Sequence, residues 1–420
     1  MIPTKPLDRR SLILAALSTV VEWYDFTLFL YLATVLARLF FVGQDAMLTT
    51  LAGFAVAYLM RPLGAVVFGH YGDRHGRRAT LLASMTLMTV SMLLSGLLPT
   101  VAQVGPVAGI LLLFLRCVMG FAVGGEYTGV VAYLLEGAAP HRRSFVTAMA
   151  AATSEVGGLL AAGVSTLTVS LLPAPALDNW GWRLPFLFGA ALAGAILVAR
   201  AAMHESPAFE VHRAAGTLVS RPLAHAMSRH RAGVARGFAI SALGSITYYV
   251  GITYLPIHLV STGGLKEADA LKLATVAALA AIVATPCVGL LADRFGRRPV
   301  LIGLAILSAA LPYLAFRLLT GAGALWALIG AVVLAALAGG VSAVGAVATA
   351  EQVPVEGRLS GLALGATTAT ALFGGLTPWF AQMLTERTGS TAVPGLMIAL
   401  VSLLVLPVLL TLPDTRSRQS

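Results

Sequence analysis

The chain alternates long apolar runs with short polar loops from near its N-terminus to near its C-terminus. A helix needs about 20 apolar residues to cross a bilayer, because each residue adds about 1.5 Å of rise. The pattern therefore predicts a series of membrane-spanning helices. The expected spans are 11–41, 45–70, 79–99, 105–136, 145–172, 181–203, 237–260, 270–292, 299–319, 325–351, 358–385 and 392–412.

The longest polar stretch lies between the sixth and seventh expected spans. It divides the chain into an N-terminal six-helix bundle over 1–203, a cytoplasmic linker over 204–236 and a C-terminal six-helix bundle over 237–420. Within the linker, the residues that follow Glu205 have the pattern of a short amphipathic helix lying on the membrane surface.

One polar loop pattern occurs in both halves. The sequence G-x3-D-R-x-G-R-R occupies 69–78 and again 289–298, each time between two apolar runs. Duplicated halves of this kind are typical of secondary transporters. The motif residues that we expect to act in gating are Gly69, Asp73, Arg74, Gly76, Arg77, Asp293, Arg294, Gly296 and Arg297.

Composition agrees with a membrane protein. Hydrophobic residues make up 58% of the chain and charged residues only 11%, whereas soluble domains carry about 25% charged residues. The net charge of +10 would suit nucleic acid binding, but most Lys and Arg residues lie in alternate loops. By the positive-inside rule, these loops and both termini face the cytoplasm. We expect the membrane to be a bacterial inner membrane. We expect contact with lipid and no nucleic acid partner.

Enzyme chemistry has little support in the sequence. There is no nucleotide-binding P-loop, no metal-ligand cluster and no Ser/His/Asp grouping, and Cys117 and Cys287 lie in apolar spans without CxxC spacing. We therefore expect no catalytic residue, no metal and no cofactor, and an ion gradient as the source of energy.

Several ionisable residues lie well inside the expected spans of the first half. A charge at the bilayer centre costs roughly 2.5–3.5 kcal/mol on insertion scales, so such residues mark functional sites. They are Glu22, Asp25, Arg61, Arg116, Glu126 and Glu155. Counted along the helices, Asp25, Arg61 and Glu155 fall near the bilayer midplane, whereas Arg116 falls nearer the outer leaflet.

The acids in this group outnumber the arginines, which predicts that some carboxylates load and release a proton. The candidate proton carriers are Glu22, Asp25, Glu126 and Glu155. Arginine binds carboxylates through two parallel hydrogen bonds, so Arg61 and Arg116 are the candidate ligands for a substrate carboxylate. The alternative is that both arginines are structural counter-ions that make the buried acids tolerable.

Aromatic residues bring polar tips and flat faces into spans that lack charges. Tyr248 and Tyr249 fall in the seventh expected span, and Trp379 falls in the eleventh. We expect these three side chains to line the substrate site from the second half.

The duplicated loop resembles the signature of the major facilitator superfamily. Further motifs are similar to the metabolite:H+ symporter family within it. They are E-W-Y-D-F at 22–26, R-P-L-G at 61–64, R-x3-G-F-x2-G-G-E-Y at 116–127, W-G-W-R-L-P-F at 180–186 and E-S-P-x-F at 205–209. That family includes proton-coupled importers of citrate, α-ketoglutarate, shikimate, dicarboxylates and proline or betaine.

The resemblance covers nearly the whole chain and implies an all-α membrane protein with the major facilitator fold. This fold has twelve transmembrane helices in two pseudo-symmetric six-helix bundles around a central cavity, and it works by alternating access. By analogy, Asp73 caps a neighbouring helix and pairs with arginines across the interface, with Asp293 as its counterpart. The resemblance also places Tyr24 and Tyr127, which lie in two of the motifs, with the substrate ligands.

The sequence thus predicts a proton-coupled symporter, acting as a monomer, that imports a small carboxylate-bearing metabolite, either an organic acid or a zwitterion. Alternatives stay open: export of a drug or metabolite in exchange for protons, osmolyte import of the betaine/proline type, and coupling to Na+. The fifth span carries S-E-V-G-G at 154–158 without the proline that is typical of exporters, which favours import. Glu155 is not a family hallmark, so it points to this protein's own substrate or coupling ion.

Overall fold

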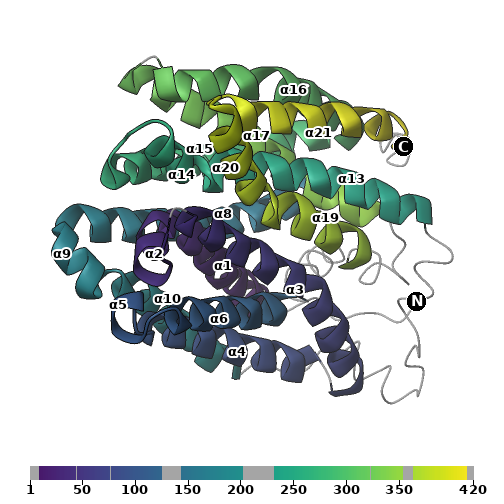
Figure 1. Ribbon diagram of the computed structural model, residues 1–420. Coiled ribbons are helices and arrows are strands. Elements are labelled where there is room, and N and C mark those ends of the chain that lie inside the picture. Colours follow the sequence, from purple (N-terminus) through teal and green to yellow (C-terminus); the bar gives the residue numbers. More distant parts are fainter. Residues whose placement is uncertain are drawn as a thin grey trace.

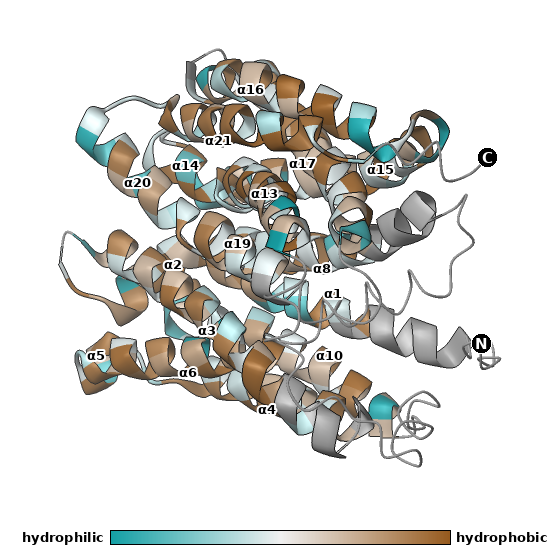
Figure 2. Cartoon of the chain, turned by 90° about the vertical axis from the view of Figure 1, so that its right-hand side faces the viewer, coloured by the Kyte–Doolittle hydropathy of each residue, from teal (hydrophilic) through white to brown (hydrophobic). Residues whose placement is uncertain are grey.

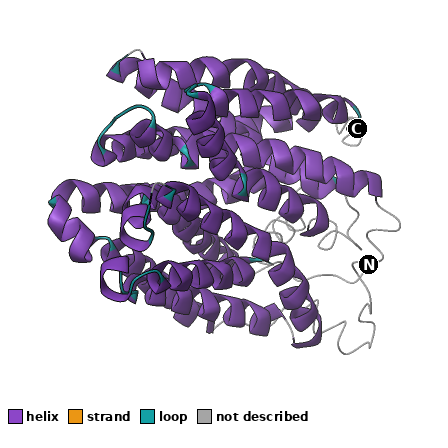
Figure 3. Ribbon diagram, viewed as in Figure 1, coloured by secondary structure: helices purple, strands orange, loops and turns teal. Residues whose placement is uncertain are grey.

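The computed structural model describes residues 9–43, 45–75, 77–124, 143–201, 231–321, 323–352 and 363–413. In these ranges the chain is helical apart from short connections and holds no strand (Figure 3). Helices follow from the apolar runs, because a bilayer offers no partner for backbone N–H and C=O groups and each segment must satisfy them internally. The amphipathic helix expected after Glu205 lies outside the described residues.

The first half of the chain forms one group of helices, drawn in purple to teal in Figure 1. Its elements are α1 (Arg9–Tyr31), α2 (Ala33–Phe40), α3 (Ala46–His75), α4 (Arg77–Leu97), α5 (Val101–Val104), α6 (Val107–Val123), α8 (Arg143–Leu171), α9 (Ala174–Ala176), the π-helical turn η2 (Leu177–Gly181) and α10 (Arg183–Ala201).

The second half forms another group, drawn in green to yellow and stacked on the first in Figure 1. Its elements are α13 (Arg231–Tyr248), the π-helical turn η3 (Tyr249–Thr253), α14 (Leu255–Ser261), α15 (Glu267–Phe295), α16 (Arg297–Gly321), α17 (Ala324–Glu351), η5 (Ala363–Thr367), α19 (Thr368–Thr370), η6 (Ala371–Gly375), α20 (Thr377–Thr388) and α21 (Val393–Leu410).

The helices follow the expected spans, with breaks that the hydrophobic pattern did not predict. Among the described residues, eight helices are long and apolar enough to cross a membrane, or up to ten if each of two bent pairs counts as one span. The first span bends by 64° between α1 and α2, and the seventh bends by 45° before α14. Pro256 in the first turn of α14 has no N–H to continue the helical ladder, which accounts for the second bend.

Both copies of the duplicated loop join consecutive helices, as expected. The first copy joins α3 to α4, and the second joins α15 to α16. In the second copy, Gly296 caps α15 with φ of +94°, a backbone conformation that strains any residue with a side chain. In the first copy, Gly76 lies outside the described residues. The structure describes only the backbone of Gly69, Asp73, Arg74 and Arg77.

The outer surface of the helices is apolar. Figure 2 shows mainly hydrophobic helices, with the more hydrophilic residues gathered towards helix ends. Large apolar side chains remain exposed, such as Phe114 at 62%, Val283 at 66% and Leu404 at 67%. Exposed apolar surface on this scale suits contact with lipid rather than with water.

Helices α3 and α8 of the first half pack against the second half. α8 runs along α15, and the hydroxyls of Thr166 and Thr275 share a hydrogen bond of 3.2 Å across this contact. α3 packs against η6, where Gly375 lies against the side chain of Tyr58. These contacts bring the charged spans of the first half next to the tyrosines of the second.

Helices α3 and α6 approach each other so closely that their contact requires glycine. A Cβ atom at Gly120 would collide with the carbonyl oxygen of Ala57, and one at Gly64 would collide with that of Phe121. Small residues at such positions let membrane helices pack backbone to backbone.

We predict that Gly120→Ala lowers the thermal unfolding midpoint of the purified protein. The added methyl group meets rigid backbone, and overpacking of this kind costs about 1–3 kcal/mol. Gly303→Ala in α16 is the matched control, because no atom lies within 4 Å of its added Cβ. Equal midpoints for the two variants would contradict the close α3–α6 contact.

Candidate functional site

The buried charges of the first half lie on α1, α3, α6 and α8. Exposed fractions are 1% for Glu22, 0% for Asp25, 7% for Arg61, 2% for Arg116 and 2% for Glu155. Because an isolated charge is costly in a bilayer, the contacts of each one decide what it can do. Two further expected site residues, Glu126 and Tyr127, lie outside the described residues. In the described part, no group of three His, Cys, Asp or Glu side chains is placed to hold a metal ion.

The Asp25 carboxylate on α1 and the Arg116 guanidinium on α6 form an ion pair with two hydrogen bonds. Nη1 donates to Oδ2 over 2.7 Å, and Nη2 donates to Oδ1 over 3.1 Å. Nη2 also lies 3.5 Å from Ser95 Oγ on α4. This bidentate geometry is the strong form of the contact between arginine and carboxylate. The two charges therefore compensate each other inside the first half.

This pairing corrects the depth expected for Arg116. Residue counting placed Asp25 near the midplane and Arg116 nearer the outer leaflet, but the 2.7 Å contact puts both charged groups at one level. Counting follows the backbone, whereas the long arginine side chain carries its charge away from it. In this conformation both terminal nitrogens of Arg116 contact Asp25, so the arginine acts as a counter-ion.

Tyr24 also belongs to the interior of the first half. Its ring is fully buried, and its hydroxyl donates to the Pro185 carbonyl oxygen on α10 over 2.7 Å. Two of the family-like motifs, at 22–26 and 180–186, thus meet each other through this contact. Tyr24 therefore holds α1 against α10 within the first half.

Arg61 on α3 lies nearer the contact between the halves. Its Nη2 is 3.3 Å from Glu22 Oε1 and donates to the Tyr58 hydroxyl over 3.2 Å. Its guanidinium carbon lies 4.1 Å from the ring centroids of both Phe26 and Tyr58, a cation–π arrangement. Its Nε has no hydrogen-bond partner among the described residues. Arg61 therefore keeps donor capacity that a ligand can use.

Two consecutive tyrosines of the second half contact two different helices of the first half. The Tyr249 hydroxyl shares a hydrogen bond with the hydroxyl of Tyr58, beside Arg61. The Tyr248 hydroxyl donates to Glu155 Oε2 on α8 over 3.1 Å. Adjacent side chains on a helix point about 100° apart, so one segment contacts α3 and α8 at once.

Trp23, which the sequence did not single out as a site residue, packs against both tyrosines. Its ring centroid lies 4.9 Å from that of Tyr248 and 6.1 Å from that of Tyr249. Gly374 in η6 lies against the Tyr249 ring, where an added Cβ would come within 2.8 Å. Trp379, which the sequence predicted to line the substrate site, packs with Phe380 at 4.9 Å between centroids and against the apolar core.

The second copy of the duplicated loop carries an ion-pair group within the second half. Arg297 Nη2 lies 3.6 Å from Asp293 Oδ1 and 3.6 Å from Glu351 Oε1 at the end of α17. The Arg294 guanidinium lies 5.4 Å from the ring centroid of Phe295. These contacts tie the ends of α15, α16 and α17 together. Glu351, which the sequence placed near a span end, is the partner that ties α17 to the loop.

At the opposite end of α15, one arginine joins the two halves. Arg38 on α2 lies 2.9 Å from Asp178 Oδ1 in η2 and 2.6 Å from Glu267 Oε1 at the start of α15. Sequence reasoning missed this group, because charges near span ends are common and carry no signal alone. One signal in the sequence could have indicated this group: all three residues fall on the same expected side of the membrane.

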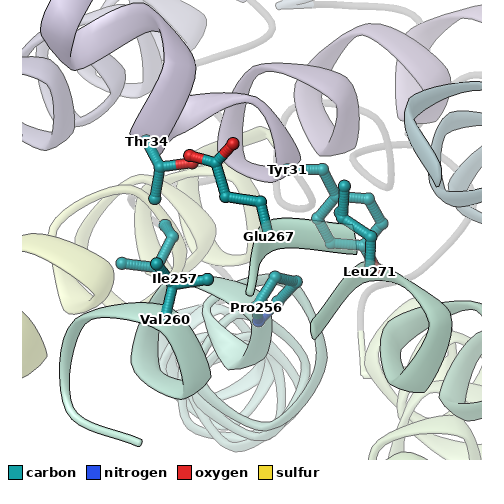
Figure 4. Close-up of a pocket in the computed structure, with 7 residues that line it drawn as sticks. All are labelled: Tyr31, Thr34, Pro256, Ile257, Val260, Glu267 and Leu271. Atoms are coloured by element: carbon teal, nitrogen blue, oxygen red, sulfur yellow. The ribbon is translucent and has the colours of Figure 1, made fainter. Parts of the chain in front are cut away.

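A small pocket lies beside this ion-pair group (Figure 4). It is lined by Tyr31, Thr34, Pro256, Ile257, Val260, Glu267 and Leu271. In Figure 4 the Glu267 carboxylate points towards Thr34 of α2. The cavity of about 10 Å³ has room for about one water molecule. The helices α2, α14 and α15 therefore pack tightly where the two halves meet at this end.

Duplicated helical halves, a repeated loop at one end of each half and buried charges between the halves define a secondary transporter. The model of the family described as "Sugar (and other) transporter" matches residues 11–221 and 217–419. The chain belongs to this family of the major facilitator superfamily, among its metabolite:H+ symporters. It is a multi-pass membrane transporter and not an enzyme.

Individual relatives agree with this assignment. The chain is 34% identical to an ectoine/proline transporter of Corynebacterium glutamicum, over 91% of this chain and 79% of the relative. It is 32% identical to a citrate-proton symporter of Klebsiella pneumoniae, over 89% and 85%. The solved structure of the proton:xylose symporter of E. coli has a TM-score of 0.77 at 19% identity, covering 97% of this chain and 96% of that one. That likeness shows the fold of twelve helices in two pseudo-symmetric six-helix bundles.

We predict that Arg38→Gln loosens the contact between the halves at this end, because it removes the ion pairs with both Asp178 and Glu267. Exposed ion pairs contribute about 0.2–1 kcal/mol each, so the loss of two pairs is expected to raise the accessibility about two- to thirtyfold. The measurement is the labelling rate of Val260→Cys with a membrane-impermeant maleimide in a background that carries Cys117→Ser and Cys287→Ser.

Lys272→Gln is the matched control for this experiment. It removes a surface ion pair of 2.8 Å with Asp269, which lies within α15 and does not join the halves. Its labelling rate should equal that of the parent. An unchanged rate in Arg38→Gln would show that the ion-pair group does not hold this end closed.

Proposed function

We propose that this protein is a proton-coupled symporter that imports a small carboxylate-bearing metabolite, an organic acid or a zwitterion, by alternating access. The observation that carries the proposal is the fully buried, bidentate ion pair between Asp25 and Arg116. Family membership supports it, as do relatives named as an ectoine/proline transporter and a citrate-proton symporter. Ectoine, proline and citrate all carry a carboxylate.

The ion pair provides a reversible switch for one proton. With Asp25 ionised, its two oxygens hold Arg116 and neither charge is left alone. When Asp25 takes a proton it becomes neutral, and Arg116 loses its counter-ion; breaking a buried pair from one side costs about 3–5 kcal/mol. The arginine then needs another anion. Proton binding thereby changes the electrostatic balance of the first half and favours arrival of a negatively charged group.

Arg61 is the proposed ligand for the substrate carboxylate. One Nη atom serves both Glu22 and Tyr58, and the guanidinium otherwise rests on aromatic rings. An incoming carboxylate has donors available to it and meets a guanidinium already fixed in place, which lowers the entropy lost on binding. Because Tyr58 contacts Tyr249, substrate at Arg61 acts directly on the contact between α3 and the second half.

The proposed topology follows the basic loops. The N-terminal bundle covers 1–203, the linker 204–236 and the C-terminal bundle 237–420. Both termini, the linker and both copies of the duplicated loop face the cytoplasm of a bacterial inner membrane. The ion pairs of Arg38 then close the outer side, and the duplicated loops act at the inner side. Both halves of the site come from one chain, so the proposed functional unit is a monomer.

We predict that Asp25→Asn abolishes accumulation driven by an inward proton gradient but retains exchange of labelled for unlabelled substrate. Asparagine cannot take up the proton, whereas the ligands for the substrate carboxylate remain. The measurement is uptake of radiolabelled L-proline, glycine betaine and citrate into proteoliposomes, with an imposed proton gradient, with a Na+ gradient and with neither. The double variant Asp25→Asn, Arg116→Gln removes both charges and tests whether an unpaired arginine affects folding.

The control is Asp269→Asn, a surface carboxylate that forms an ion pair with exposed Lys272. It should accumulate substrate as the parent does. Uptake by the parent that follows the Na+ gradient and ignores the proton gradient would contradict proton coupling. Gradient-driven extrusion without uptake would instead identify an exporter.

A further inference from the structure

Glu155 differs from the other buried acids of the first half in its electrostatic partners. It lies in the middle of α8 at the contact with α13, and its Oε2 accepts a hydrogen bond from the neutral Tyr248 hydroxyl. Glu22 and Asp25 each have an arginine. In the described ranges, no Lys, Arg or His nitrogen lies within 4.0 Å of the Glu155 carboxylate. Its charge therefore lacks a counter-ion there.

Unused polar groups surround this carboxylate. Thr27 Oγ1 and Tyr31 OH are buried and have no hydrogen-bond partner among the described residues. They lie four residues apart, on one face of α1. Gly158, one turn after Glu155, lies close against two of these groups: an added Cβ would lie 3.3 Å from Tyr248 OH, a tight contact, and 3.8 Å from Thr27 Oγ1. Buried polar groups without partners call for a ligand or water to satisfy them.

Aromatic rings lie next to the hydrogen bond between Tyr248 and Glu155. The rings of Trp23 and Tyr248 meet edge to face, with centroids 4.9 Å apart and planes at 73°. Aromatic faces attract ammonium groups, and tryptophan does so most strongly. A carboxylate, free hydroxyl oxygens and aromatic rings together form the chemistry that recognises a positively charged nitrogen, including a quaternary nitrogen that has no hydrogen to donate.

The opposite charge lies on the other side of the tyrosine pair. Tyr248 contacts Glu155, while Tyr249, whose ring centroid is 5.6 Å from that of Tyr248, contacts Tyr58 beside Arg61. Along the contact between the halves, the order is a carboxylate, three tyrosines and a guanidinium. The two charges on opposite sides of the tyrosines have the polarity that suits a molecule with a positive nitrogen at one end and a carboxylate at the other.

We propose that Glu155, Trp23 and Tyr248 form a subsite for the positively charged nitrogen of a zwitterionic substrate whose carboxylate binds Arg61. The inference rests on the proposed function and names the substrate class of the same site. Glu155 lies between the halves, where substrate passes during alternating access. Asp25 lies inside the first half with its own arginine. Glu155 therefore serves substrate recognition, and Asp25 serves the proton.

The test is equilibrium binding to the purified full-length protein at one pH and without any ion gradient. The probes are glycine betaine and L-proline as zwitterions, succinate and citrate as anions, and choline as a cation without a carboxylate. We expect the parent to bind the zwitterions in preference to the other three. Glu155→Gln should weaken zwitterion binding about 10- to 100-fold, the loss expected when an interaction with a charged group is removed.

Matched variants separate recognition from folding. Gly158→Ala keeps the Glu155 charge but adds a methyl group 3.3 Å from Tyr248 OH, so it should also weaken zwitterion binding. Asp269→Asn lies on the surface and should bind as the parent does. Equal thermal midpoints without ligand, across all three variants and the parent, show that the losses come from the site.

The proposal is overturned if the parent prefers succinate or citrate, if none of the five probes binds, or if Glu155→Gln binds the zwitterions as the parent does. The outcomes distinguish this inference from the symporter proposal. Accumulation of citrate with a proton gradient, together with weak zwitterion binding, refutes the zwitterion subsite and leaves the symporter standing. Tight betaine or proline binding, together with uptake that does not depend on the proton gradient, supports the zwitterion subsite and refutes proton coupling.

Discussion

A charge inside a bilayer needs an opposite charge nearby, because leaving it alone costs roughly 2.5–3.5 kcal/mol at the helix centre on insertion scales. Asp25 and Arg116 meet this requirement with two hydrogen bonds, and their contact fixes α1 against α6. Tyr24, next along α1, ties the same helix to α10. With α1 held in this way from inside the first half, Glu22 reaches Arg61 and Trp23 reaches the tyrosines of the second half.

The second half contacts the charged helices of the first half through neutral side chains. Tyr248 and Tyr249 meet Glu155 and Tyr58 through hydroxyls, which are hydrogen-bonding groups without charge. A neutral hydrogen bond contributes about 0.5–1.5 kcal/mol net, whereas separating a buried ion pair costs about 3–5 kcal/mol. At the buried centre, contacts between the halves that must form and break during alternating access are therefore made with hydroxyls. The strong ion pair stays within one half, where rocking of the two bundles does not pull it apart.

The spans and the repeated loop were predictable because each is a local signal: an apolar run of about 20 residues, or a motif at matching positions. Glu155 and the other buried charges were predictable for the same reason. Their partners were not, since Asp25 and Arg116 are 91 residues apart and backbone counting misplaced the guanidinium. The bend between α1 and α2 was equally hidden, because the apolar pattern continues through it. The break before α14 was not predicted either, although Pro256 is a local signal that could have marked it.

The fold is duplicated but its electrostatics are not, and this difference indicates where the conformational equilibrium is set. The ion pairs of Arg38 that join the halves have side chains 38%, 37% and 21% exposed, and pairs of that exposure contribute little after screening. Such a contact closes one end without locking it. Larger electrostatic energies arise at the buried residues Asp25, Arg61 and Glu155. There, binding of a proton or of a charged ligand changes which buried charges have an opposite charge nearby. The binding of a proton or a ligand at these buried residues, more than the strength of the Arg38 ion pairs, then determines which conformation is stable.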